Sequence, residues 1–372
     1  MRKIKFGVIG LKGVGQTHIN EIANIEGAEL TAVADINEEV GKFVSSKYNV
    51  KWYKNYEDML AMEDLDAISI CTPHFLHFPM VMKALNYGKH VLVEKPMAIT
   101  VKEADQMIEE ARRRGLKLGV VYQRRTDPTY QKIKEMISQG EIGRIYRACM
   151  EVCTFRSQAY YDRDAWRGKW ATEGGGVLIN QTIHQIDILQ WLVGKPVEVC
   201  GKIGTFYHNV EVEDIASAVI KFENEAHGVI QVTTIDPINF ERFEICGEKG
   251  KIVSEDGRNE IKYAILDKSV KEYIFSETTS LKPTYQWNRI EIKRDSTMPG
   301  HRKIIEDFVR AIVDDRDPMI PGEEGKVSLE IVNAIILSSF EGRSVSIPID
   351  REAYERLIKE KLGARRSQST VL

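Results

Sequence analysis

The sequence of 372 residues contains no apolar run that reaches the about 18 uncharged residues needed to cross a membrane. It contains only five scattered cysteines with no Cys-x-x-Cys pair, which argues against a disulfide framework and a structural zinc site. It has no basic surplus, because 52 Lys and Arg face 55 Asp and Glu, which argues against nucleic acid as the main partner. The N-terminus lacks the apolar core of a signal peptide, so we expect a cytoplasmic protein.

The composition is that of a folded protein, with 43% hydrophobic and 29% charged residues. At about 150 residues per domain, this length predicts two or three structural units. In the first third, short apolar segments alternate with helix-like segments, which predicts βαβ units and a doubly wound parallel sheet of the α/β class. The strand-like segments are 4–9, 29–34, 67–71, 90–93 and 117–122, and the helix-like segments are 17–25, 38–48, 79–87 and 101–114.

The pattern changes after Gln123. A long alternating strand is expected over 145–155 and an amphipathic helix over 181–192, followed by strand-length runs with turn residues between them from 197 to about 275. This pattern predicts a second α/β domain with a large open, mostly antiparallel sheet. Because an exposed apolar sheet face invites association, we expect a homodimer or homotetramer.

The first strand runs into a glycine-rich turn, Gly10-Leu-Lys-Gly13-Val-Gly15, which begins a helix. Such glycines let the backbone approach a pyrophosphate, and the helix N-terminus supplies free N–H groups. Lys12 occupies the second glycine position of the usual Gly-x-Gly-x-x-Gly pattern, so an ordinary tight turn remains the alternative. Asp35 ends the second strand at the spacing of a ribose-binding carboxylate, which favours NAD over NADP. The predicted cofactor residues here are Gly10, Lys12, Gly13, Val14, Gly15 and Asp35.

Two later segments, Cys71-Thr-Pro-His-Phe-Leu-His77 and Glu94-Lys95-Pro96, follow predicted strands at the end where ligands bind in open α/β sheets. A poorly solvated lysine there can exchange protons with a substrate hydroxyl, although most lysines in loops are simply solvated. After three glycines at 174–176, Asn180, His184 and Asp187 have the spacing of one helical face. A histidine satisfied inside a partly buried helix is the alternative for His184.

Together, these motifs resemble those of the Gfo/Idh/MocA family, whose members are NAD(P)-dependent oxidoreductases of sugars, cyclitols and related polyols. The likeness runs in order from about residue 3 to residue 349. The resemblance implies that Lys95 is catalytic, with a cis peptide bond to Pro96. It also implies cofactor contacts for Thr72, Pro73, His77 and Glu94, and a less certain one for His74, which stands where the family often has asparagine.

Asn180 departs from the inositol-dehydrogenase-like members of the family, which have aspartate there. Because an amide cannot relay a proton, we expect His184 to accept the substrate proton while Lys95 polarises the substrate oxygen. With Asn180 followed by Gln181, the sequence resembles family branches that act on pyranose rings.

The aromatic loop 160–170 has the residue types that stack on sugars, although an interface loop is equally compatible with it. The family resemblance implies that Trp166 and Arg167 contact both NAD and substrate. Gln123 completes the predicted cofactor contacts. The predicted substrate residues are Lys95, Arg124, Tyr161, Asn180, His184, Asp187 and Tyr285.

We therefore expect an NAD-dependent enzyme that transfers a hydride between a secondary hydroxyl of a sugar or cyclitol and nicotinamide. The alternatives are a UDP-N-acetylhexosamine 3-dehydrogenase with tightly held NAD, a reductase that uses the same site in the opposite direction, and a non-catalytic sensor of NAD or sugar. We expect no metal, since the eight histidines form no His-x-x-x-His pair. The expected domains are a Rossmann domain over 1–123, a substrate and oligomerisation domain over 124–350, and a C-terminal helix with a frayed tail over 351–372.

Overall fold

The computed structural model describes residues 2–255, 259–276, 281–293 and 300–368, with the side chains of 363–368 excepted. The described residues divide into two compact units. The first contains residues 2–123, 171–174 and 300–329, and the second contains residues 124–170, 175–293 and 330–368. The segment 300–329 thus packs with the N-terminal residues, whereas the sequence had suggested an unbroken second domain over 124–350.

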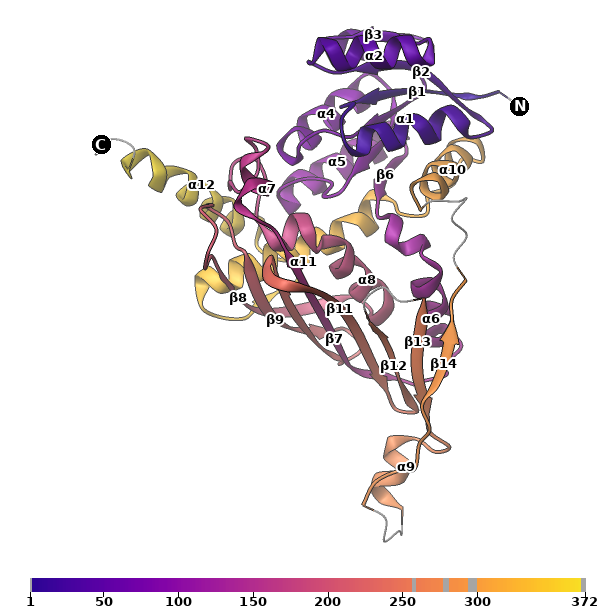
Figure 1. The fold of residues 1–372 in the computed structure, drawn as a ribbon, viewed down its shortest axis with the longest axis vertical. Coiled ribbons are helices and arrows are strands. Elements are labelled where there is room, and N and C mark those ends of the chain that lie inside the picture. Colours follow the sequence, from indigo (N-terminus) through magenta and orange to yellow (C-terminus); the bar gives the residue numbers. More distant parts are fainter. Residues whose placement is uncertain (1, 256–258, 277–280, 294–299, 369–372) are drawn as a thin grey trace. The chain divides into compact units, whose positions relative to one another are not determined.

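Six parallel strands form the sheet of the first unit in the order β3-β2-β1-β4-β5-β6 (Figure 1). The central strands are almost wholly buried and apolar because helices cover a parallel sheet on both faces. The predicted doubly wound sheet is confirmed. Its strands are β1 (Ile4–Ile9), β2 (Ala28–Ala34), β3 (Lys51–Tyr53), β4 (Ala67–Ile70), β5 (His90–Glu94) and β6 (Leu118–Val121). Its helices are α1 (Val14–Asn24), α2 (Glu38–Tyr48), α3 (Tyr56–Leu60), α4 (His74–Asn86), α5 (Val101–Arg114) and α10 (Gly300–Val313).

The register of this sheet aligns the carboxyl ends of its central strands. Ile9 of β1 pairs with Ile70 of β4, and Ile70 lies opposite Val93 of β5. The loops that follow these three strands therefore begin side by side at one edge, which is where open α/β sheets bind their ligands.

Nine strands form the sheet of the second unit in the order β14-β13-β12-β11-β7-β10-β9-β8-β15. Its neighbouring strands are antiparallel except for the parallel pair β7 and β10, which confirms the predicted mostly antiparallel sheet. Its strands are β7 (Ile145–Phe155), β8 (Pro196–Gly204), β9 (Ile215–Phe222), β10 (His227–Thr233), β11 (Ile235–Gly247), β12 (Gly250–Glu255), β13 (Glu260–Ile265), β14 (Asn288–Glu291) and β15 (Val345–Ser346). The remaining helices are η1 (Gln123–Thr126), α6 (Pro128–Ser138), α7 (Gln158–Asp162), η2 (Val177–Gln181), α8 (Ile183–Val193), α9 (Val270–Phe275), α11 (Gly322–Glu341) and α12 (Arg351–Gln368).

Two predicted helices have different boundaries. The helix expected over 79–87 begins at His74, directly after Pro73, and contains Pro79 in its interior. The helix expected over 181–192 is a π-helical turn that ends at Gln181, followed by α8 from Ile183. The spacing of one continuous helix therefore does not relate Asn180 to the residues of α8. Residues 369–372 of the predicted frayed tail lie outside the described residues.

No helix in the described part of the chain combines the length and the apolar character that a bilayer crossing requires.

Candidate active site

The glycine-rich turn of the first unit packs too tightly for side chains. Gly10 has φ +85°, and a Cβ there would lie 2.6 Å from the carbonyl oxygen of Cys71. A Cβ on Gly15 would lie 2.0 Å from the carbonyl oxygen of Gly10, so the first turn of α1 reaches the strand end only with glycine. Gly13 faces open space and caps α1 without a side-chain hydrogen bond. These features fit a pyrophosphate that accepts the free N–H groups of the helix N-terminus.

Asp35 stands directly after β2 and is bound to this turn. Its two carboxylate oxygens accept hydrogen bonds from the backbone N–H of Leu11 at 2.9 Å and of Asn37 at 2.8 Å. The side chain is half-buried and each oxygen keeps a further lone pair. This arrangement fits a carboxylate that accepts hydrogen bonds from ribose hydroxyls and repels a 2′-phosphate.

His77 connects the loops that follow β4 and β5. Its ring nitrogens lie 2.7 Å from the Pro96 carbonyl oxygen and 2.8 Å from the Thr72 carbonyl oxygen. Burial lowers the pKa of His77 despite these two acceptors, which favour the charged ring. Nearby, His74 Nδ1 donates to the Glu173 carbonyl oxygen at 2.9 Å. Both rings thus contact backbone, so their nitrogens hold the loops around Thr72, Pro73 and Lys95 in place. The Lys95–Pro96 peptide is cis.

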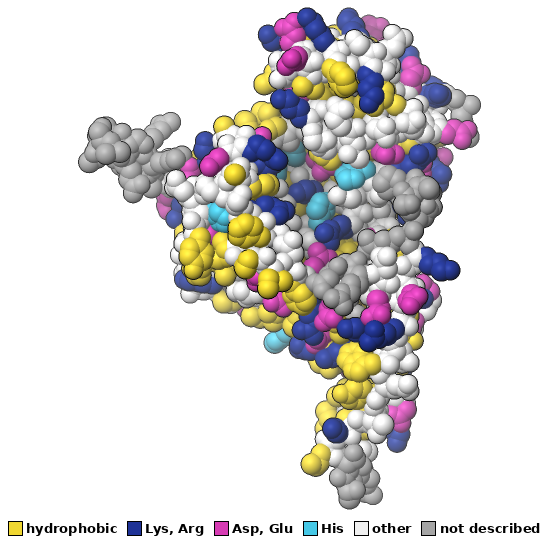
Figure 2. All heavy atoms as spheres, in the orientation of Figure 1, with side chains coloured by type: hydrophobic (Ala, Val, Ile, Leu, Met, Phe, Trp, Pro, Cys, Tyr) yellow, Lys and Arg dark blue, Asp and Glu magenta, His cyan; other side chains and the backbone are white. Residues whose placement is uncertain are grey.

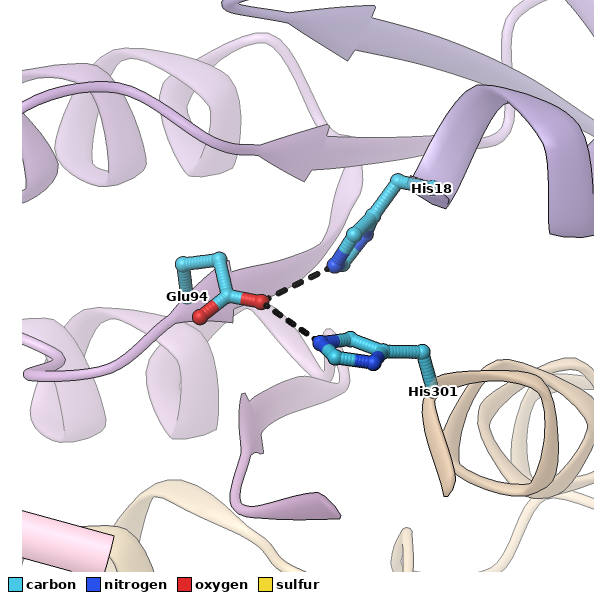
Figure 3. Close-up of side chains that lie close together, drawn as sticks. All are labelled: His18, Glu94 and His301. Carbon is cyan, nitrogen blue, oxygen red and sulfur yellow. Dashed lines mark hydrogen bonds and ion pairs between the residues drawn. The ribbon is translucent and has the colours of Figure 1, made fainter. Parts of the chain in front are cut away.

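Glu94, at the end of β5, is held by two histidines from different helices (Figure 3). Its Oε1 lies 3.0 Å from Nε2 of His18 and 3.6 Å from Nε2 of His301, and its Oε2 accepts the backbone N–H of Lys95 at 3.1 Å. Nδ1 of His18 lies 2.7 Å from Oγ of Ser69. Burial alone would raise the pKa of Glu94, but the hydrogen bond from His18 and the ion pair with His301 hold it well below its usual value. The ionised carboxylate therefore fixes the backbone of Lys95.

Among the described residues, His18, Glu94 and His301 also form a group of possible metal ligands. Their ligand atoms lie within 4.8 Å of one another. The hydrogen bond of 3.0 Å and the ion-pair contact of 3.6 Å that Glu94 makes with the two histidines account for the cluster without a metal ion.

In the second unit, the hydroxyl of Tyr160 connects the aromatic loop to the segment that carries the predicted catalytic histidine. It accepts hydrogen bonds from Arg167, from Asn180 at 3.4 Å and from Gln181 at 3.1 Å. Arg167 also lies 4.5 Å from the ring centroid of Trp166 and donates to Asp164 at 2.9 Å. His184 is half-buried in the first turn of α8.

Three predicted substrate residues have other surroundings. Asp187 is buried, and its carboxylate receives two hydrogen bonds from Arg125, at 2.8 and 2.7 Å. Tyr161 is buried, and its hydroxyl lies 3.1 Å from Oγ1 of Thr234. Tyr285 is exposed and packs edge-on against Trp287. The contacts of Asp187 and Tyr161 hold the second unit together, and their substrate roles remain predictions.

A polar pocket of about 560 Å³ lies within the second unit. It is formed by the start of α6, the end of β7, the start of α8 and the middle of β11. Its lining includes Arg124, one of the predicted substrate residues, and further polar side chains for which the sequence predicts no role. These are Tyr130, Arg156, Gln181, Gln185, Asn239 and Glu241.

Comparisons with known proteins identify the family of the chain. Residues 4–122 match the model described as "Oxidoreductase family, NAD-binding Rossmann fold", and residues 130–253 match the GFO/IDH/MocA C-terminal domain. The WlbA dehydrogenase of Bordetella pertussis, solved with NADH and UDP-GlcNAcA, is 30% identical at a TM-score of 0.80 and covers 94% of this chain and 100% of its own. The chain belongs to the Gfo/Idh/MocA family of oxidoreductases.

Curated members of the family are also similar over much of the chain. The myo-inositol 2-dehydrogenase of Thermotoga maritima is 27% identical over 92% of this chain and 98% of its own. The scyllo-inositol 2-dehydrogenase (NAD(+)) of Bacillus subtilis is 28% identical over 67% of this chain and 73% of its own. The first unit is thus an NAD-binding Rossmann domain, and the predicted family, oxidoreductase class and cofactor are confirmed.

The pocket residues that were not predicted from the sequence lie in segments with little local pattern to identify them. Gln181 and Gln185 flank His184, and their positions beside a candidate catalytic residue could have pointed to them. Glu241 had no local signal, because it reaches the pocket through the pairing of β11 with β7, where it lies opposite Val152. Only this long-range strand pairing places its carboxylate beside Arg124.

Proposed function

We propose that this oxidoreductase oxidises a secondary hydroxyl of a sugar or cyclitol with NAD. The observation that carries the proposal is the position of Lys95. It follows β5 at the same sheet edge as the glycine turn after β1, and Glu94, His77 and the Pro96 carbonyl fix the loop around it. A lysine so held beside the NAD-binding turn is suited to act on the oxygen of a bound alcohol.

NAD, when bound, would supply the acceptor for the hydride from the carbon that carries the hydroxyl. Asp35 and the N-terminus of α1 would hold and orient it in the first unit. Lys95 donates a hydrogen bond to the substrate oxygen, which stabilises the negative charge that develops as the proton leaves. His184 accepts that proton, and Asn180 orients the substrate by hydrogen bonding, because an amide cannot take up a proton itself.

The test is NADH formation by the purified protein with a panel of inositols, hexoses and nucleotide sugars. Lys95→Ala and His184→Ala should each lower turnover about 10²-fold or more while NAD still binds. Lys42→Ala, which changes an exposed lysine on α2, and His227→Ala, which changes an exposed histidine on β10, are the matched controls. Unchanged turnover in Lys95→Ala or His184→Ala would refute the assigned role, and no NADH from the whole panel would refute the proposed function.

The similarity to WlbA, which was solved with UDP-GlcNAcA, favours a second candidate. This is a UDP-N-acetylhexosamine dehydrogenase that keeps NAD bound between turnovers. Nicotinamide absorbance in the purified protein, together with a UDP-sugar released on denaturation, would identify it. A purified protein with neither nicotinamide absorbance nor a bound UDP-sugar would favour the first candidate.

We further propose a homo-oligomeric, cytoplasmic enzyme. On the outer face of the second sheet, Cys200, Val219 and Val229 lie in register on adjacent strands, and the two valines are 51% and 42% exposed. Figure 2 shows further hydrophobic side chains around α9, where Ile274 and Phe275 are 67% and 79% exposed. Exposed apolar side chains in register on a sheet face favour association with another copy. Light scattering tests the proposal, and a stable monomer would refute it.

A further inference from the structure

Four charged side chains line the pocket of the second unit, and three of them form an ion pair or cap a helix. Arg124 donates to both carboxylate oxygens of Glu241, at 2.8 and 2.9 Å. Asp127 accepts the backbone N–H of Thr129 at 2.8 Å and so caps α6. Arg156 makes no ion pair with any carboxylate of the described residues. Its positive charge is therefore left for a ligand.

Arg156 is also held in a fixed orientation. One guanidinium nitrogen donates to Oγ1 of Thr154 at 3.1 Å and to the Phe155 carbonyl oxygen at 2.9 Å. The guanidinium lies 5.2 Å from the ring centroid of Tyr160, and the Arg156 carbonyl accepts Nε2 of His208 at 2.7 Å. Its Nε is buried without a hydrogen-bond partner. Because only one nitrogen of this guanidinium has acceptors among the described residues, its other N–H donors can form two parallel hydrogen bonds with a carboxylate or phosphate.

The pocket also presents acceptors for hydroxyl groups. The amide nitrogen of Gln181 donates to Tyr160 and that of Gln185 donates to Glu241 at 2.7 Å, whereas the amide oxygen of each is buried without a protein partner. Buried acceptors of this kind are normally satisfied by water or a ligand. Gln181 and Gln185 lie three residues before and one residue after His184 along the chain, which is why we assign this pocket to the same substrate.

We propose that the substrate is a polyhydroxylated anion whose carboxylate or phosphate is bound by Arg156. This inference rests on the proposed function and narrows it from sugars and cyclitols in general to their acids and phosphates. A neutral sugar can offer hydroxyl oxygens to Arg156 but no negative charge. Hydrogen bonds between a guanidinium and an anion are stronger than those to a neutral hydroxyl, so neutral substrates should be disfavoured.

The experiment compares matched neutral and anionic substrates by NADH formation with the full chain. The pairs are glucose with glucuronate, glucose with glucose 6-phosphate, and N-acetylglucosamine with its UDP derivative. We expect at least one anion to exceed its neutral partner in kcat/KM by about 10- to 100-fold, the effect of one charge-assisted hydrogen-bonded pair. The first pair detects a carboxylate preference, and the other two detect a phosphate preference.

Arg156→Gln should abolish that preference, and Arg156→Lys should keep part of it, since lysine retains the charge but not the planar fork. Arg144→Gln, which changes an exposed arginine paired with Glu248, should leave the preference unchanged. Equal turnover of neutral and anionic partners, or a preference that survives in Arg156→Gln, would overturn the inference while leaving the proposed function intact.

If no compound yields NADH, the proposed function fails, and calorimetric titration of glucuronate and glucose 6-phosphate decides the inference separately. Binding that is weaker by about 10-fold or more in Arg156→Gln than in the unchanged chain supports it. Equal binding, or no binding of either anion, overturns it.

Discussion

Replacing Asp187 with asparagine should destabilise the second unit strongly. The side chain of Asp187 is 1% exposed and that of Arg125 is 4% exposed, and two hydrogen bonds join them. Asp187→Asn keeps the shape but removes the negative charge that pairs with the buried guanidinium of Arg125. Removing one partner of a buried pair costs about 3–5 kcal/mol, so we expect a loss of that size.

Urea unfolding measures this loss. Trp191 reports on the site, since its ring centroid lies 5.8 Å from the guanidinium of Arg125. With an m value of about 3 kcal/mol per M, the midpoint should fall by about 1–2 M. The double variant Arg125→Met with Asp187→Leu should recover much of the stability, because it removes both charges.

The control is Glu248→Gln, which breaks the exposed pair with Arg144 and should cost about 1 kcal/mol or less. If Asp187→Asn lowers the midpoint no more than this control, the reasoning from burial is refuted. A variant of full stability whose KM for substrate rises would instead restore the role of Asp187 as a substrate contact.

Three further predictions concern the first unit. Gly15→Ala should abolish NAD binding measured by calorimetry, since its Cβ would overlap the Gly10 carbonyl oxygen; retained affinity would contradict this. Asp35→Ser should raise the ratio of NADP to NAD activity by about 10-fold or more, because it removes the charge that repels a 2′-phosphate; an unchanged ratio would count against Asp35. Glu94→Gln should lower the melting temperature most near pH 7. The lowered pKa of Glu94 stabilises the fold fully above the unfolded value of about 4.3, and this stabilisation is lost as the pH falls through the native pKa, so the difference should shrink in acid. A pH-independent difference would refute this reasoning.

Local patterns in the sequence were enough to predict the NAD-binding half of the site. A buried strand, a glycine turn and a helix follow one another within 24 residues, and the glycines are required by contacts as short as 2.0 Å. The position of Asp35 and Lys95 at one sheet edge was predictable because each follows a strand of the parallel sheet, and their roles remain predictions. The helix at α8 was predictable as a helix, but its break at Thr182 was not, since hydrophobic periodicity does not distinguish a π-turn from an α-helix.

Tertiary structure decided the contacts between distant segments. His301 reaches Glu94 only because α10 packs within the first unit, and Glu241 reaches Arg124 only through the pairing of β11 with β7. Neither contact leaves a periodic signal in sequence, because each depends on one long-range pairing rather than on neighbours along the chain. The sequence by itself therefore determined the nucleotide-binding edge, because the strand, the glycine turn and the helix that form it are consecutive along the chain. The roles of Asp187 and Arg156 depend on tertiary contacts. Asp187 is buried against Arg125, whereas Arg156 lines the pocket and has no ion-pair partner among the described residues.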